Sequence, residues 1–159
     1  MAYIDDTDTD LNKAGGGLKG MLPYGLGVFR LRLKRIYFYK GFKGKAYRAS
    51  GTVIESNRRD VPVGSEWCTH DKIDPDPKKK DRKLGNFASL IRAASNMGPD
   101  DNINDKKKEL LEAGLDEDCD LGVILDCVQT ENADSQGRKN DAGDVLKYTN
   151  REFTYVGEV

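Results

Sequence analysis

The chain has 159 residues, of which 37% are hydrophobic and 33% are charged, and this composition is typical of one globular domain with its own core. No stretch approaches the roughly 18 consecutive apolar residues of a membrane span, and the acidic N-terminus lacks the basic and apolar segments of a signal peptide. Three irregularly spaced cysteines do not indicate a disulfide framework. We therefore expect a soluble, cytoplasmic protein with no membrane partner.

The net charge of −1 conceals a strong sorting of charge along the chain. Residues 13–54 contain ten lysines and arginines and no acid, whereas residues 98–159 contain sixteen acids and seven basic residues. A local excess of cations is what binding to a polyanion requires, even in a protein of low net charge.

The first half of the chain predicts a flexible arm followed by a β-hairpin. Residues 1–25 are rich in Asp, Thr and Gly without periodicity, which is typical of an arm. From Val28, apolar and basic residues alternate as in a half-buried strand, and the phase shifts at Lys34 and Arg35, so we expect a β-bulge there. Residues 40–45 (KGFKGK) supply a turn, and residues 46–55 return as a second strand. The hairpin spans residues 26–54.

The rest of the chain predicts three more strands and two short helices. The expected elements are a strand at 61–69, a charged loop at 71–83, helices at 84–94 and 104–111, and strands at 121–130 and 145–156. Asn104 is the expected cap of the second helix, and Gly114 marks its end. Three strands, a helical connection and two strands form the element order of an OB-fold, a five-stranded Greek-key barrel. The fold class is therefore mainly β, with residues 26–159 as one domain.

Several segments resemble the OB-fold single-stranded DNA-binding proteins encoded by bacteriophages. They are AYRASGTVIESN at 46–57, VPVGS at 61–65 with Trp67, LGNFASLIRAA at 84–94, the strand at 121–130, and FTYV at 153–156. The resemblance covers most of the chain. It implies a non-enzymatic protein that coats single-stranded DNA during phage DNA replication or recombination in the host cell cytoplasm, with replication or recombination proteins as further partners.

The hairpin supplies both chemical groups that sequence-tolerant binding to single strands needs. Cations follow the phosphates, and flat side chains stack on bases at about 1–3 kcal/mol per base. The candidate cations are Arg30, Arg32, Lys34, Lys40, Lys43, Lys45 and Arg48, and the candidate aromatic residues are Tyr37, Tyr39, Phe42 and Tyr47. With a bulge at Lys34 and Arg35, the outward face carries Arg30, Arg32, Tyr37 and Tyr39. The competing interpretation is a solvated strand face with ordinary half-exposed tyrosines.

Three other features of the sequence indicate a functional site less clearly than the hairpin does. The basic run Lys78, Lys79, Lys80, Arg82 and Lys83 is either a phosphate-binding loop or a solvated one. Cys68, His70, Cys119 and Cys127 supply the minimum inventory of a zinc site, but not the spacing of a known module. Trp67 follows a strand alternation and is expected in the core.

The sequence offers few candidate catalytic residues. His70 is the sole histidine, so no Ser or Cys nucleophile has a second histidine as its partner. Asp74 with Asp76, and Asp100 with Asp101, are expected to be turn residues rather than Mg²⁺ ligands of a nuclease. We therefore predict no enzyme, no metal and no cofactor. The alternative function is an interaction or structural module whose basic hairpin docks an acidic partner, and the oligomeric state stays open.

Overall fold

The structure, a computed structural model, describes residues 10–13, 28–57, 62–76, 79 and 84–159. A 3-10 helix, η1, spans Leu11–Lys13. The strands and helices that follow are β1 (Val28–Gly41), β2 (Gly44–Ser56), β3 (Glu66–Lys72), α2 (Gly85–Ala94), α3 (Asn104–Ala113), β4 (Val123–Ala133) and β5 (Lys147–Glu158). No helix in this part of the chain combines the length and the apolar character that crossing a membrane requires.

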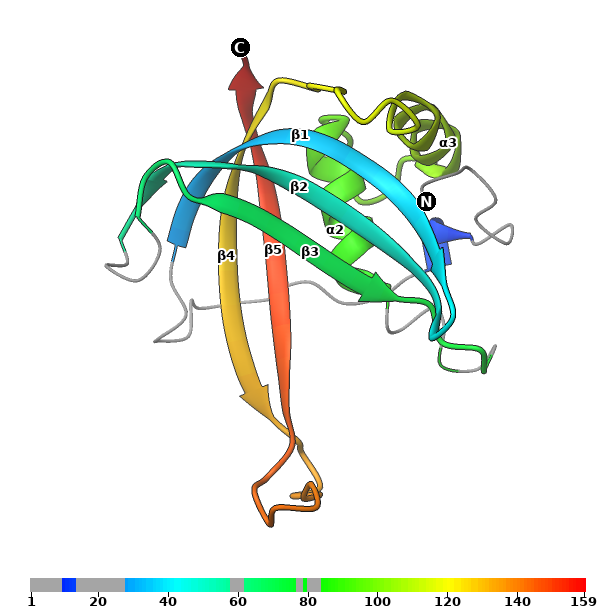
Figure 1. Cartoon of the computed structure of the whole chain (residues 1–159), viewed down its shortest axis with the longest axis vertical. Coiled ribbons are helices and arrows are strands. Elements are labelled where there is room, and N and C mark those ends of the chain that lie inside the picture. The colour runs from blue at the N-terminus through cyan, green and yellow to red at the C-terminus, as the bar shows by residue number, and fades with distance from the viewer. Residues whose placement is uncertain (1–9, 14–27, 58–61, 77–78, 80–83) are drawn as a thin grey trace.

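The strands form one antiparallel sheet in the order β3-β2-β1-β4-β5. Figure 1 shows β4 and β5 crossing β1, β2 and β3 steeply, as in a strongly curled sheet. A mainly β chain with this sheet and two helices is compatible with an OB-like fold. The predicted closure into a barrel is not observed, because within the described residues β3 and β5 pair only with β2 and β4. Nor is the predicted Greek-key order shown.

Helix α2 explains why β5 does not continue the ladder to β3. The Asn86 Oδ1 accepts a hydrogen bond from the backbone N–H of Arg151, and the Ser89 Oγ accepts one from that of Phe153. These two amides of β5 are therefore satisfied by the helix rather than by another strand. Side chains connect the two edge strands: Arg151 is ion-paired with Asp71 of β3, and the Trp67 ring lies edge-on to Phe153 at 5.8 Å.

The predicted bulge in β1 is confirmed. The pairing of β1 with β2 shifts register between Leu33 and Arg35, so that Lys34 has no partner on β2. The shift returns apolar residues to the inner face of the sheet. Buried on that face, on both sides of the bulge, are Phe29, Leu31, Leu33, Ile36 and Phe38.

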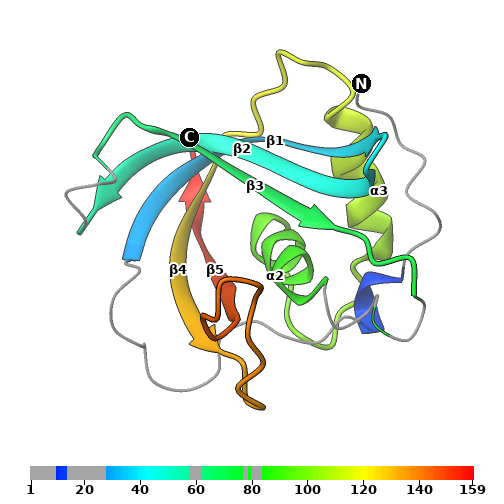
Figure 2. The same ribbon diagram turned by 60° about the horizontal axis from the view of Figure 1, so that its bottom comes forward.

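The core lies between this inner face and α2. The apolar residues of α2 recur at helical spacing, and Phe87, Leu90 and Ile91 are all buried. The Phe87 ring is stacked on Tyr47 of β2, with 4.1 Å between the ring centroids. Figure 2 shows α2 beneath the layer formed by β1, β2 and β3. The other face of this layer, called the outer face below, carries no described helix.

Helix α3 packs against β1, and its C-terminal end touches the β1 backbone. As predicted, Gly114 follows the last helical residue. A Cβ at this position would lie only 1.8 Å from the Ile36 backbone oxygen. The Gly114 carbonyl also accepts a hydrogen bond from the Arg35 Nε at 2.7 Å. The side chain that follows the bulge is thereby tied to the end of α3.

Gly114→Ala should therefore destabilise the protein. The contact is with backbone and cannot be relieved by a side-chain rotation, so we expect a loss of about 1–3 kcal/mol in the free energy of unfolding, as for other overpacked sites. Urea unfolding followed by the fluorescence of Trp67, the single tryptophan, measures this loss. Gly157→Ala is the matched control, because its Cβ would meet nothing within 4 Å. Equal stabilities of the two variants would contradict the close approach.

Three sequence expectations need correction at their boundaries. The third strand begins at Glu66 rather than residue 61 and continues to Lys72, into the expected loop. Asn104 does not cap α3, because its side chain instead bonds to the Leu11 N–H and the Asp10 carboxylate. Leu11 is fully buried, so the part of the predicted arm that the structure describes, residues 10–13, is anchored to the domain. The rest of residues 1–25 lies outside the described residues.

Candidate nucleic-acid interface

The register of the sheet gathers aromatic and cationic side chains on the outer face near the β1–β2 turn. Tyr37 pairs with Arg48, and Arg48 pairs with His70 on the next strand. Directly paired residues of antiparallel strands share a face, so these three side chains point to the same side. Lys72 lies on that face as well, two residues beyond His70.

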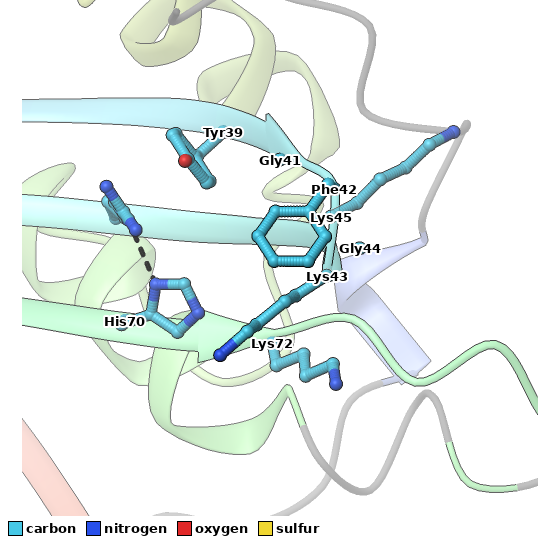
Figure 3. Close-up of a pocket in the computed structure, with 9 residues that line it drawn as sticks. Tyr39, Gly41, Phe42, Lys43, Gly44, Lys45, His70 and Lys72 are labelled. Carbon is cyan, nitrogen blue, oxygen red and sulfur yellow. Dashed lines mark hydrogen bonds between the residues drawn. The ribbon is translucent and has the colours of Figure 1, made fainter.

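A shallow pocket of about 230 Å³ lies at this end of the outer face. The residues lining it are Tyr39, Gly41, Phe42, Lys43, Gly44, Lys45, Arg48, His70 and Lys72 (Figure 3). These described lining residues include no carboxylate. The pocket, called the hairpin pocket below, thus offers cations and aromatic rings to an anionic ligand.

Arg48 organises the hairpin pocket. Its guanidinium lies over the Tyr39 ring, with the Cζ 3.7 Å from the ring centroid. The Arg48 Nε donates a hydrogen bond of 2.9 Å to the His70 Nδ1. Tyr39 and His70 also meet edge to face at 6.5 Å. These contacts fix the direction of Arg48 while it keeps further N–H donors in its guanidinium.

His70 is held as a neutral imidazole in this arrangement. Partial burial lowers its pKa below the ordinary value of 6.5, and the neighbouring positive charges of Arg48 and Lys72 lower the pKa further. Asp71 opposes the shift. A histidine among cations loses its proton more readily because its charged form is repelled.

Phe42 and Lys43 form the tip of the hairpin. They are the two residues between β1 and β2, and the Phe42 side chain is 98% exposed. The Lys43 Nζ lies 5.8 Å from the Phe42 ring centroid. Figure 3 shows Phe42 above the pocket and Lys43 reaching toward His70 and Lys72. An apolar ring that is almost wholly in water has no role in the core and is available to a ligand.

The two arginines that begin the predicted site lie on the outer face, but acids from other strands neutralise them. The Arg30 Nε is 2.8 Å from Asp126 of β4, and its Nη1 is 3.5 Å from Glu55. Arg32 is paired with Asp120 at 2.7 Å. Residues 13–54 contain no acid in the sequence, but the fold brings acids from elsewhere in the chain to Arg30 and Arg32.

The remaining predicted residues divide between faces. Tyr37 is on the outer face with the Arg35 guanidinium 4.2 Å from its ring centroid, so Tyr37 and Tyr39 each have a cation on one side of the ring. Tyr47 is a correction, because it is fully buried against Phe87 and cannot stack on a base. The side chains of the other three predicted cations do not lie on the outer face beside the pocket. Lys34 is exposed at the bulge, and Lys40 and Lys45 pair with each other on the opposite face. The Lys45 side chain points away from the pocket (Figure 3).

Two residues of the hairpin pocket, His70 and Lys72, are not among the nucleic-acid-binding residues predicted from the sequence. The sequence predicts a strand that ends at Thr69 and a loop that begins at Asp71, so it assigns neither His70 nor Lys72 to a face of the sheet. The signal was present, since residues 66–72 alternate exposed and buried without interruption. The strand pattern is hard to recognise in the sequence because the next inward position after Thr69 carries a charged residue, Asp71, where an apolar residue is expected.

The other constellations do not form sites in the described residues. No group of three or more His, Cys, Asp and Glu side chains there is placed to hold a metal ion. Cys68 is exposed, whereas Cys127 is buried. The Asp74 carboxylate accepts the N–H of Asp76, as in a turn. In the basic run at 78–83 only Lys79 is described, and it is exposed.

A search against protein-family models and a search of curated proteins both find no match for the chain.

Proposed function

We propose that this protein binds single-stranded DNA without sequence preference and coats it, as the resemblance to phage single-stranded DNA-binding proteins implies. One observation carries the proposal: the hairpin pocket combines an exposed ring, Phe42, with Lys43, Arg48 and Lys72, and none of the described residues that line it is an acid. OB-folds, with which this sheet is compatible, bind oligonucleotides on the face of strands 2 and 3 beside the loop between strands 1 and 2, and this location of the pocket supports the proposal.

The chemistry of the hairpin pocket suits a single strand better than a duplex. A base stacks on a protein ring only when its own face is free, which a paired and stacked base does not offer. Phe42 presents such a ring beyond the end of the sheet, and Arg48 stacked on Tyr39 presents a second flat, cationic surface. Stacking does not distinguish one base from another, so the expected affinity is tolerant of sequence.

We expect the main binding energy to come from the tip, Phe42 and Lys43, and the pocket beside it rather than from the whole hairpin. Arg30 and Arg32 already hold carboxylates at 2.8 and 2.7 Å, so a phosphate would have to compete with these acids. Lys43 and Lys72 have no such competition from the residues that line the pocket. We expect these two lysines to contribute more to the salt dependence of binding than the two arginines.

Titration of a labelled oligo-dT, followed by fluorescence anisotropy at several salt concentrations, tests the function. Binding should weaken steeply with salt, with a slope of log K against log salt of about −0.7 per phosphate contacted. Lys43→Gln with Lys72→Gln should reduce the slope by about 1.4 if each lysine meets one phosphate. Lys106→Gln with Lys108→Gln on α3 is the control for the loss of two positive charges.

Two other outcomes would redirect the proposal. If oligo-dT did not bind at low salt, the single-strand function would be wrong, and the docking of an acidic protein on the same pocket would become the better hypothesis. Loss of the oligonucleotide only in the presence of Mg²⁺ would indicate a nuclease. The prediction of a non-enzymatic protein requires that the oligonucleotide stay intact.

A further inference from the structure

The hairpin pocket contains a histidine that accepts a hydrogen bond from a neighbouring arginine. The His70 Nδ1 accepts the Arg48 Nε–H at 2.9 Å. A ring nitrogen that accepts a hydrogen bond carries no proton, so the imidazole is neutral and its proton is on Nε2. Figure 3 shows this second nitrogen turned toward the side of the pocket where Lys43 lies.

The charges around His70 come from three neighbouring elements. Arg48 faces it from β2, Lys72 and Asp71 flank it on β3, and Lys43 extends toward it from the turn (Figure 3). From β1, the ring of Tyr39 meets it edge-on. Among these groups Asp71 is the sole acid, and it lies on the inner face, where it is bound to Arg151. The charged groups described around the outer side of His70 are therefore all cations.

A phosphate in the pocket would reverse this balance. An anion near an imidazole favours its charged form, just as the surrounding cations disfavour it. A protonated His70 would donate from both nitrogens, and the Arg48 Nε–H, released from Nδ1, would become a donor to the anion. The pocket thus holds a hydrogen-bond arrangement that a phosphate can exchange for a stronger, charge-assisted one.

We propose that the hairpin pocket seats one backbone phosphate of the bound strand between Arg48, Lys43 and Lys72, and that His70 takes up a proton from solvent when this phosphate arrives. This inference rests on the proposed function and adds a ligand group and a regulation to it. Affinity for single strands should then rise as the pH falls from about 8 to 5.5, by up to tenfold for each unit by which binding raises the pKa of His70.

The sole histidine of the chain makes a direct test available. Histidine labelled with ¹³C and ¹⁵N gives one set of imidazole NMR signals, which can be titrated with pH at constant salt. Free protein should show a pKa below 6.5, with the neutral form protonated on Nε2. Saturation with an unphosphorylated oligo-dT should raise the pKa by about one unit or more. An unchanged pKa in a protein that demonstrably binds oligo-dT would overturn the phosphate seat and leave the proposed function intact.

The variant His70→Gln distinguishes the effect of the proton on His70 from the effect of the other groups in the pocket. His70→Gln retains an oxygen that can accept the Arg48 N–H but does not titrate. It should not show the gain in affinity for oligo-dT that the unmodified protein shows between pH 8 and pH 5.5. The His70 side chain is exposed, so the variant should fold normally, which thermal unfolding checks. An unaltered pH dependence in His70→Gln would also overturn the proposal.

The source of the phosphate is tested with inorganic phosphate alone and with a 5′-phosphorylated oligo-dT of the same length. Equal shifts of the histidine pKa by the two oligonucleotides support a backbone phosphate. A shift that requires the terminal phosphate, or one produced by inorganic phosphate but not by the unphosphorylated oligonucleotide, would contradict it. Failure of every oligonucleotide to bind at low salt would instead refute the single-strand function itself.

Discussion

Phe42→Ala should weaken the binding of oligo-dT by about 5- to 150-fold, which corresponds to the ~1–3 kcal/mol of one base stacked on an aromatic ring. The residue lies at the tip of the β1–β2 hairpin and is 98% exposed, so its removal takes nothing from the core. The loss of affinity should therefore occur without a change in the free energy of unfolding. Anisotropy titration gives the first quantity, and urea unfolding followed by Trp67 fluorescence gives the second.

Two further substitutions at this position distinguish stacking from simple apolar contact. Phe42→Trp keeps a flat ring and should retain or increase the affinity for oligo-dT, whereas Phe42→Leu keeps an apolar side chain without a ring and should resemble Phe42→Ala. Val63→Ala, at an exposed turn between β2 and β3, is the control for the loss of an exposed apolar side chain. If Phe42→Leu bound like the unmodified protein, base stacking on this ring would be refuted.

Arg151→Met should cost about 3–5 kcal/mol of stability, because it leaves the buried Asp71 without its partner. The two side chains are 14% and 8% exposed and form the ion pair between the edge strands β5 and β3. Burial raises the pKa of Asp71, and the charge of Arg151 offsets part of that rise. Without the arginine, the ionised carboxylate remains in a poorly solvated position. Urea unfolding at neutral pH measures the loss.

The pH dependence of this variant has a definite sign. Removal of Arg151 should raise the folded-state pKa of Asp71 further above the unfolded value, so the loss is largest where the carboxylate is ionised in both states. It should shrink as the pH falls below the raised folded-state pKa, because the folded protein then binds the proton first. The difference in unfolding free energy from the unmodified protein should therefore be smaller near pH 5 than near pH 7.

Matched variants define the contribution of the pair. Lys147 lies on β5, the strand of Arg151, and forms an exposed ion pair with Glu131 of β4. Lys147→Met, which breaks this pair, should change the free energy of unfolding by only about 0–1 kcal/mol. Asp71→Asn combined with Arg151→Met should recover part of the loss, because it removes the unpaired charge. A single Arg151→Met variant as stable as the Lys147→Met control would show that the ion pair does not hold the two edge strands together.

The parts of the fold that depend on neighbouring residues could be predicted from the sequence. The β1–β2 hairpin follows from an alternating pattern and two glycines, and its bulge follows from two consecutive basic residues between apolar ones. Helix α2 follows from apolar spacing. The extension of β3 could not be read in the same way, because Asp71 is an inward position made tolerable by Arg151, 80 residues further along the chain.

The candidate site was predictable to a similar extent and for the same reason. Phe42, Lys43 and Arg48 follow from the composition of the hairpin, and the structure brings them into one pocket. The neutralisation of Arg30 by Asp126, 96 residues away, depends on the pairing of β1 with β4 and has no local signal. Tyr47 was misplaced because its neighbours, Ala46 and Arg48, do not specify a face, and tyrosine is common on both.

At the two-residue turn between β1 and β2 and in the strand that follows it, the residues that line the hairpin pocket differ from those that build the core. Tyr47 and Arg48 are consecutive, yet one stacks in the core and the other lines the pocket, so insertions within β2 would exchange them. Phe42 and Lys43 carry no such constraint, since both side chains project into solvent. If the proposed function holds, substitutions at the tip should change the affinity for single-stranded DNA at little cost in stability, so the tip is the position at which to engineer stronger or weaker binding.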